Sequence, residues 1–154
     1  MTSFEPWRPE RGQEIIADLT GLDGAALPMF HALQDAFGHV PKDAVAMIAH
    51  ALNLSRAEVF GALSFYHDFR HDPPGARVVK VCRAESCQAM GGEAAGRFLL
   101  ADLGIDWGET TPDGAVTVEP VYCLGLCAVS PAVLVGGQPL GRVDGMLLVE
   151  AARA

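Results

Sequence analysis

All four cysteines of this 154-residue chain lie in two short stretches, and no other feature limits the possible folds as strongly. Cys82 and Cys87 are spaced C-x4-C, and Cys123 and Cys127 are spaced C-x3-C. Each pair follows a short run rich in β-branched residues, which is typical of a strand that ends in a loop. If the two strands are neighbours in one sheet, both loops leave the sheet at the same end and the four sulfurs converge.

Four convergent thiolates have three common uses. They hold an iron–sulfur cluster, they hold a structural zinc ion, or they form two disulfides. The second loop contains Leu124-Gly125-Leu126 and is apolar. An apolar loop favours a cluster, because a cluster with four thiolates carries negative charge and needs shielding from water together with backbone N–H donors. Zinc and disulfides stay open as alternatives at this point.

Glycines lie close to both pairs. Gly125 lies inside the second pair, and Gly91-Gly92 follow the first. A glycine has no Cβ, so these positions allow a close approach of the backbone to a bound group. Ordinary turn chemistry explains them equally well.

Composition excludes several functions. The chain is 50% hydrophobic with a net charge of -8, so we expect no nucleic-acid partner, which would need a basic surface. No apolar stretch approaches the ~20 residues that a membrane span requires. Residues 1–7 lack the basic and apolar regions of a signal peptide. We therefore expect a cytoplasmic protein, in which thiols stay reduced and are available to bind a metal.

The first half of the chain predicts a helical bundle over residues 12–72, after an irregular N-terminus over residues 1–11. Apolar residues recur at helical spacing, and start and stop signals separate the segments. The predicted helices cover residues 13–19, residues 28–37 with Gly38 as the stop, a segment that opens at Pro41, and a segment that follows a Ser55–Glu58 capping box and carries Phe60 and Leu63. The aromatic residues Phe65, Tyr66 and Phe69 then either pack the bundle or form a docking surface.

Pro73-Pro74-Gly75 predicts a domain boundary, and residues 76–154 read as a second domain. Its predicted elements are strand 76–82, helix 90–103, strands 115–121, 132–135 and 139–143 with a hairpin at Gly136-Gly137, and a last helix from Asp144. The chain is therefore of the α+β or α/β class, with a mixed sheet in a thioredoxin-like arrangement. The cysteine pairs are not C-x-x-C and no cis-proline loop precedes a dithiol, which argues against a thioredoxin redox site.

The cysteine motifs, with Ser64-Phe65-Tyr66 at the end of the helical segment, resemble the thioredoxin-like [2Fe-2S] ferredoxin family found as a small subunit of NADH-dehydrogenase-type modules. Within it, residues 33–38, 54–59 and 65–70 are most similar to the gamma subunit of soluble NAD-dependent formate dehydrogenase. The resemblance implies one [2Fe-2S] cluster, with Cys82 and Cys87 on one iron and Cys123 and Cys127 on the other.

The resemblance also implies partners. The chain contains no G-x-G-x-x-G and no G-x-x-x-x-G-K-[ST], and we expect FMN and NAD to belong to a flavin/NAD-binding beta subunit. A molybdenum- or tungsten-containing alpha subunit would oxidise formate. The chain itself would not be catalytic alone and would exchange single electrons with the flavin. The alternatives are a subunit of NADH:quinone oxidoreductase or of an NAD-reducing hydrogenase, and a zinc-stabilised, non-enzymatic interaction module.

Overall fold

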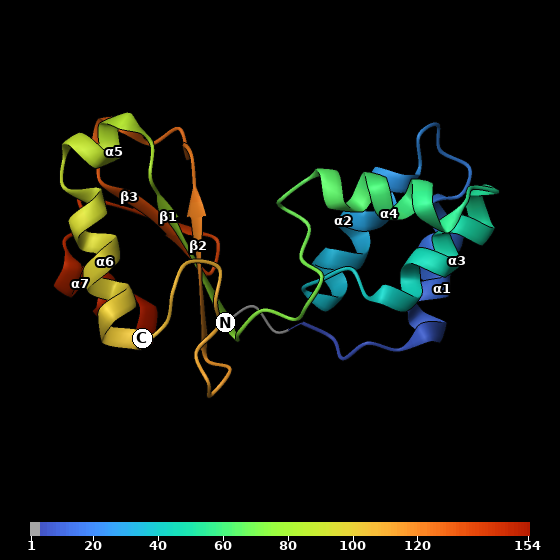
Figure 1. The fold of residues 1–154 in the computed structure, drawn as a ribbon, viewed down its shortest axis with the longest axis horizontal. Coiled ribbons are helices and arrows are strands. Elements are labelled where there is room, and N and C mark those ends of the chain that lie inside the picture. Colours follow the sequence, from blue (N-terminus) through green and yellow to red (C-terminus); the bar gives the residue numbers. More distant parts are fainter. Residues whose placement is uncertain (1–3) are drawn as a thin grey trace. The chain divides into compact units, whose positions relative to one another are not determined.

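The computed structural model describes residues 4–154, which form two compact units (Figure 1). The chain passes from the helical unit to the sheet-containing unit at Pro73–Pro74. None of the helices in residues 4–154 combines the length and the apolar character that a bilayer crossing requires.

The first unit consists of helices around one apolar core. Its elements are α1 (Pro9–Leu19), α2 (Ala26–Phe37), α3 (Lys42–Leu52) and α4 (Arg56–Phe65). The largest fully buried side chains within its helices are those of Met29, Phe30, Leu33, Ile48, Val59 and Leu63. In α2 and α4 they recur at intervals of three or four residues, so the helical period places them on one face. The helix α1 begins at Pro9, and the prediction of an irregular segment was therefore wrong for residues 9–11; proline is well suited to a first helical turn.

Local signals set the ends of these helices. Gly38 adopts a left-handed conformation (φ 79°) and ends α2, with its N–H on Gln34 O at 2.7 Å, as predicted. At the start of α4, the Ser55 hydroxyl accepts the Glu58 N–H at 3.1 Å, and the Glu58 carboxylate accepts the Ser55 N–H at 2.8 Å. The predicted capping box is confirmed, and it satisfies two backbone donors that the helix itself leaves unpaired.

The aromatic residues at the end of α4 divide between core and surface. Phe69 is buried and meets Phe30 edge-on with ring centroids 5.3 Å apart. Phe65 is 72% exposed and Tyr66 is also exposed. Phe60 lies in α4 as predicted, but its ring is exposed, with its centroid 6.1 Å from that of His71.

The second unit contains a four-stranded mixed sheet in the order β2-β1-β3-β4. The strands are β1 (Arg77–Cys82), β2 (Val116–Val121), β3 (Ala132–Val135) and β4 (Gln138–Gly141). β1 pairs in parallel with β2 and antiparallel with β3, and β3 pairs antiparallel with β4. The two outer strands each contain a proline, Pro120 in β2 and Pro139 in β4.

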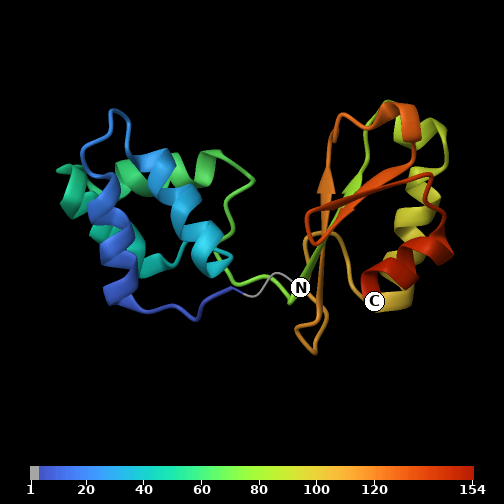
Figure 2. The ribbon, with the colours of Figure 1, turned by 180° about the vertical axis from the view of Figure 1, so that it is seen from behind.

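Helices cover one face of this sheet. Figures 1 and 2 show α6 (Gly92–Leu103) and α7 (Gly145–Arg153) side by side on that face. Fully buried side chains from strands and helices meet between the two layers, among them Val79, Val81, Leu99, Val118, Val133 and Leu148. The helix predicted over residues 90–103 is α6. The short helix α5 (Glu85–Ala89), which precedes it and is separated from it at Met90 and Gly91, was not predicted.

The capping box gives a first prediction. We expect Ser55→Ala to lower the free energy of unfolding of the helical unit by about 1 kcal/mol, because the Glu58 N–H loses its acceptor. The measurement is urea denaturation followed by circular dichroism. Ser64→Ala in the same helix is the matched control, since that exposed hydroxyl only donates to Gly61 O. Equal effects of the two substitutions would contradict the stabilising role of the cap.

Candidate metal centre

The sheet brings both cysteine stretches to one end. β1 ends at Cys82, which is the register partner of Val121, the last residue of the parallel neighbour β2. The Arg83 N–H continues this pairing with a hydrogen bond of 2.7 Å to Val121 O. Cys123 follows two residues after the end of β2. The two strands are thus neighbours, and the condition under which both loops leave the sheet at the same end is met.

Cys82 and Cys87 form a buried pair. Their residues are 4% and 2% exposed. Side chains alternate between the faces of a strand, so Cys82 lies on the opposite face from Val81, which packs under the helices. The short helix α5 brings Cys87 back to Cys82, and the two side chains are buried in one cluster. Ala132 is buried with them, and the partly buried side chains that pack against this cluster are Ala84, Val121, Leu124 and Leu126.

Polar groups from both loops reach these sulfurs. Burial raises the pKa of Cys82, and the hydrogen bond with Cys87 adds to this, although the backbone groups of Ala84 and Leu124 act against it. Burial also acts to raise the pKa of Cys87. The Ser130 hydroxyl, the Ala132 backbone and Cys82 lower this pKa by more, so the net pKa of Cys87 is lowered. Of these two thiols, Cys87 therefore loses its proton more readily, and a thiol must lose its proton to bind a metal.

Ser130 connects the two stretches. Its hydroxyl lies 2.8 Å from Ser86 Oγ and 3.7 Å from Cys87 Sγ, and it donates to Cys127 O at 2.9 Å. This residue was not predicted from the sequence, because a serine gains such a role only from its tertiary neighbours. Its place before Pro131, three residues after the last cysteine, was the available signal. The Ser130–Pro131 peptide bond is cis, which was not predicted either.

The second pair is arranged differently. Cys123 and Cys127 are both exposed, and Cys127 begins the short 3-10 helix η1 (Cys127–Val129). Cys123 has a φ of 136°, and the N–H of Gly125 (φ 73°) donates to Cys123 Sγ at 3.3 Å. Residues 4–154 include no group of three or more His, Cys, Asp or Glu side chains placed to hold a metal ion. In this structure the second loop therefore lies beside the Cys82–Cys87 pair. Contrary to the expectation, the sulfurs of Cys123 and Cys127 do not converge with those of the first pair.

These surroundings nevertheless fit a cluster held by thiolates. Sulfur atoms of both pairs are within reach of hydrogen-bond donors, from Leu124 and Ala84 to Cys82 and from Gly125 to Cys123. Leucine side chains of the second loop cover the first pair. Donors to sulfur and an apolar cover are the features by which a protein stabilises the charge of an iron–sulfur cluster.

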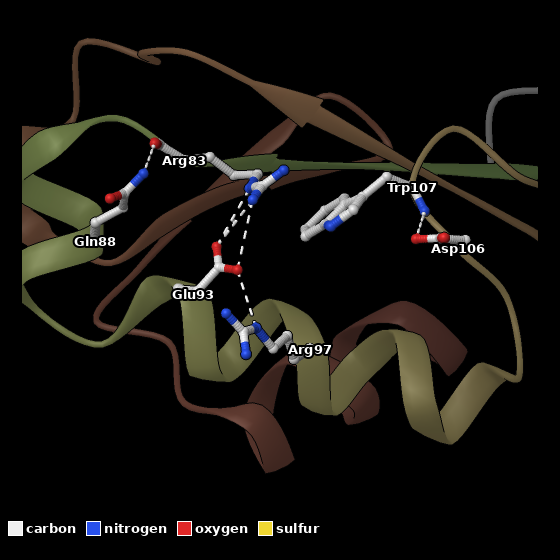
Figure 3. A network of polar contacts seen from close by, with 6 residues as sticks. All are labelled: Arg83, Gln88, Glu93, Arg97, Asp106 and Trp107. Atoms are coloured by element: carbon white, nitrogen blue, oxygen red, sulfur yellow. Dashed lines mark hydrogen bonds and ion pairs between the residues drawn. The ribbon is translucent and has the colours of Figure 1, made fainter.

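A polar network fixes the first cysteine stretch to its surroundings (Figure 3). The Arg83 guanidinium pairs with Glu93 at 3.2 Å and lies 4.7 Å from the ring centroid of Trp107. Arg97 donates to the same carboxylate at 3.0 Å, and Gln88 donates to Arg83 O at 2.7 Å. Hydrogen bonds from Arg97, the larger influence, and from Arg83 lower the pKa of Glu93 despite its partial burial. The residue after the first cysteine is thereby tied to α5, to α6 and to the segment before β2.

Gly92 allows the approach that brings Cys87 into place. A Cβ on Gly92 would lie 2.7 Å from Cys87 O and 3.1 Å from Cys87 C. Gly91 adopts a φ of 92°, so it serves the turn between the two helices. Of the two explanations that the sequence left open for this pair of glycines, close approach applies to Gly92 and turn chemistry to Gly91.

Comparison with known proteins gives consistent relatives. The sequence profile described as thioredoxin-like [2Fe-2S] ferredoxin matches residues 12–151. The NADP-reducing hydrogenase subunit HndA of Solidesulfovibrio fructosivorans is 31% identical over 130 residues, which cover 84% of this chain and 76% of the relative. An NADH-quinone oxidoreductase subunit of Rhizobium meliloti is 37% identical over 120 residues, which cover 78% of this chain and 71% of the relative.

A solved structure shows the same architecture. An NAD+-reducing [NiFe]-hydrogenase in the air-oxidized state superposes with a TM-score of 0.71 and 26% identity over 83% of this chain. The match covers 22% of the hydrogenase chain, so the present chain corresponds to about a fifth of that larger protein.

The contact at Gly92 gives a second prediction. We expect Gly92→Ala to lower the free energy of unfolding by about 1–3 kcal/mol, because the new methyl group overlaps the Cys87 carbonyl and the chain must shift. Chemical denaturation of the metal-free protein measures this effect. Gly61→Ala is the control: it lies within α4, where a Cβ meets no atom within 4 Å, and a neutral or slightly stabilising effect is expected. Unchanged stability of the Gly92 variant would show that the overlap is relieved without cost.

Proposed function

This chain belongs to the thioredoxin-like [2Fe-2S] ferredoxin family, and on that premise we propose that it is the electron-transfer subunit of an NADH-dehydrogenase-type complex. The observation that carries the proposal is the buried Cys82–Cys87 pair, which lies against the loop of the second cysteine pair. The related hydrogenase and NADH-quinone oxidoreductase subunits support the same class of complex.

We assign the ligands as the resemblance implies. Cys82 and Cys87 hold one iron, and Cys123 and Cys127 hold the other. Support comes from the register of β1 and β2, which places both pairs at one end of the sheet, and from donors directed at Cys82, Cys87 and Cys123. The exposed second pair has to turn toward the first for four sulfurs to meet, and Gly125 gives that loop backbone freedom.

The residues of this chain have distinct tasks in the proposed site. When bound, the cluster supplies the capacity to take up and give back one electron. The backbone groups of Ala84, Leu124 and Ala132 would stabilise negative charge on the first pair, and Leu124 and Leu126 would keep water from it. FMN and NAD belong to the beta subunit in this proposal, where the flavin separates the two electrons of a hydride into single electrons.

For the whole complex we propose an NAD-dependent formate dehydrogenase, of which this chain is the gamma subunit. The support is the similarity of residues 33–38, 54–59 and 65–70 to that subunit. The alpha subunit would then carry molybdenum or tungsten. The relatives reported above come from a hydrogenase and an NADH-quinone oxidoreductase, and those two complexes are the alternatives that the comparisons favour.

The ligand assignment gives a third prediction. We expect the isolated protein to contain about two irons and about two acid-labile sulfides per chain and, after reduction with dithionite, to show the electron paramagnetic resonance signal of one unpaired electron. Cys87→Ser and Cys123→Ser should each abolish or destabilise assembly of the cluster and so lower the iron content, because each removes one of the four thiolate ligands. Tyr122→Phe, which changes an exposed neighbour of Cys123, should leave it unchanged.

Two results would contradict this assignment. Normal iron and sulfide in both serine variants would exclude Cys87 and Cys123 as ligands. A colourless protein that contains zinc would favour the interaction module, with the cysteines as structural ligands.

The identity of the complex gives a fourth prediction. A tagged copy of the chain, purified from its native host, is expected to bring with it a flavin-containing subunit and the reduction of NAD by formate. Molybdenum or tungsten in the same preparation would mark the alpha subunit. Reduction of NAD by hydrogen, or of a quinone by NADH, with no formate activity would replace the formate dehydrogenase assignment by one of the two alternatives.

A further inference from the structure

Ser130 is a buried polar residue between the two cysteine stretches. Ser130 is 8% exposed, and its hydroxyl contacts Ser86, Cys87 and the backbone carbonyl of Cys127. It therefore touches one proposed ligand through its sulfur and another through its backbone. The distances are 2.8 Å to Ser86 Oγ, 3.7 Å to Cys87 Sγ and 2.9 Å to Cys127 O.

The protonation state of Cys87 decides where the hydroxyl proton of Ser130 points. A hydroxyl has one proton to donate and two lone pairs to accept with. While Cys87 is a thiol, it can donate to Ser130, and Ser130 donates to Cys127 O. A Cys87 that binds iron has lost its proton and can only accept. The Ser130 proton can then turn to Cys87 Sγ, while Ser86 donates to Ser130 Oγ.

We infer that Ser130 is a positioning residue that donates a hydrogen bond to the Cys87 sulfur of the bound cluster and raises the reduction potential, with Ser86 as the donor that orients it. This inference rests on the proposed function. A hydrogen bond to a ligand sulfur withdraws electron density and stabilises the reduced state, in which the cluster carries one more negative charge. The cluster accordingly accepts an electron more readily with this hydroxyl than without it.

Removal of the hydroxyl leaves the sulfur with other partners. The Ala132 backbone and Cys82 also contact Cys87, and the first pair keeps its apolar cover. We therefore expect Ser130→Ala to bind the cluster and to differ from the wild type in its potential. A purely structural role predicts the opposite pattern, in which cluster content falls and the potential of the remaining clusters is unchanged.

The experiment compares the wild type with Ser130→Ala, Ser86→Ala and the distant control Ser64→Ala. Iron and sulfide are measured first on each protein, and a redox titration monitored by electron paramagnetic resonance follows. We expect the wild type and Ser64→Ala to have the same, highest midpoint potential. The potential of Ser86→Ala should be lower, and that of Ser130→Ala the lowest. The Fe–S stretching bands in resonance Raman spectra should shift on transfer to D2O in the wild type, and this shift should shrink in Ser130→Ala.

Each outcome decides the inference. A fully loaded Ser130→Ala protein with wild-type potential overturns it. If Ser130→Ala does not bind the cluster, two other variants replace it: Ser130→Thr, which keeps the hydroxyl, and Ser86→Ala. A wild-type potential in Ser130→Thr together with a lowered potential in Ser86→Ala supports the inference. An unchanged potential in Ser86→Ala overturns it. A wild-type protein without iron overturns the proposed function and this inference together, and is recognised by the iron assay alone.

Discussion

The parallel pairing of β1 with β2 is the interaction on which the rest of this unit depends. It joins segments almost forty residues apart and places the end of one strand beside the end of the other. Parallel pairing requires a crossover, and α6 supplies it by packing on the sheet. The buried Val79 and Val118 belong to this packed layer. The core that stabilises the sheet therefore also holds the two cysteine loops at the same end of the strands.

Local signals were sufficient to predict much of this fold. The valine-rich runs before each cysteine pair are strands, Gly38 ends a helix, and Ser55 and Asp144 begin helices through their side chains. Each of these features depends on a few residues that are adjacent in the sequence, so it can be read from the sequence alone. The helix α5 was missed because it is only five residues long and has no side-chain cap to mark its start. The exposure of the Phe60 ring could not be predicted, because helical spacing does not tell which apolar residues fall at the margin of the core.

In the candidate site, too, the features set by local sequence could be predicted, and those set by tertiary contacts could not. Cys82 is the last residue of a strand, so the sheet determines its direction, and the sequence was enough to place it. Cys123 and Cys127 lie in an irregular loop, where turn geometry determines their directions, and their exposure did not follow from spacing. Ser130 and the contacts of Arg83 with Glu93 and Trp107 depend on segments that meet only in the folded chain. For these contacts the residue types alone carried too little information.

The prolines of the outer strands have a consequence for the behaviour of the protein in solution. A sheet with free edges can add a strand from another molecule and so begin to aggregate. Pro120 and Pro139 lie in the two outer strands, and proline has no N–H to offer to an incoming strand. Residues 108–111 also cover part of the outer side of β2 through hydrogen bonds to Val116 and Val118. Neither edge therefore presents an unbroken row of donors. In a chain that is half hydrophobic, this protects each copy from pairing with the next during folding and assembly.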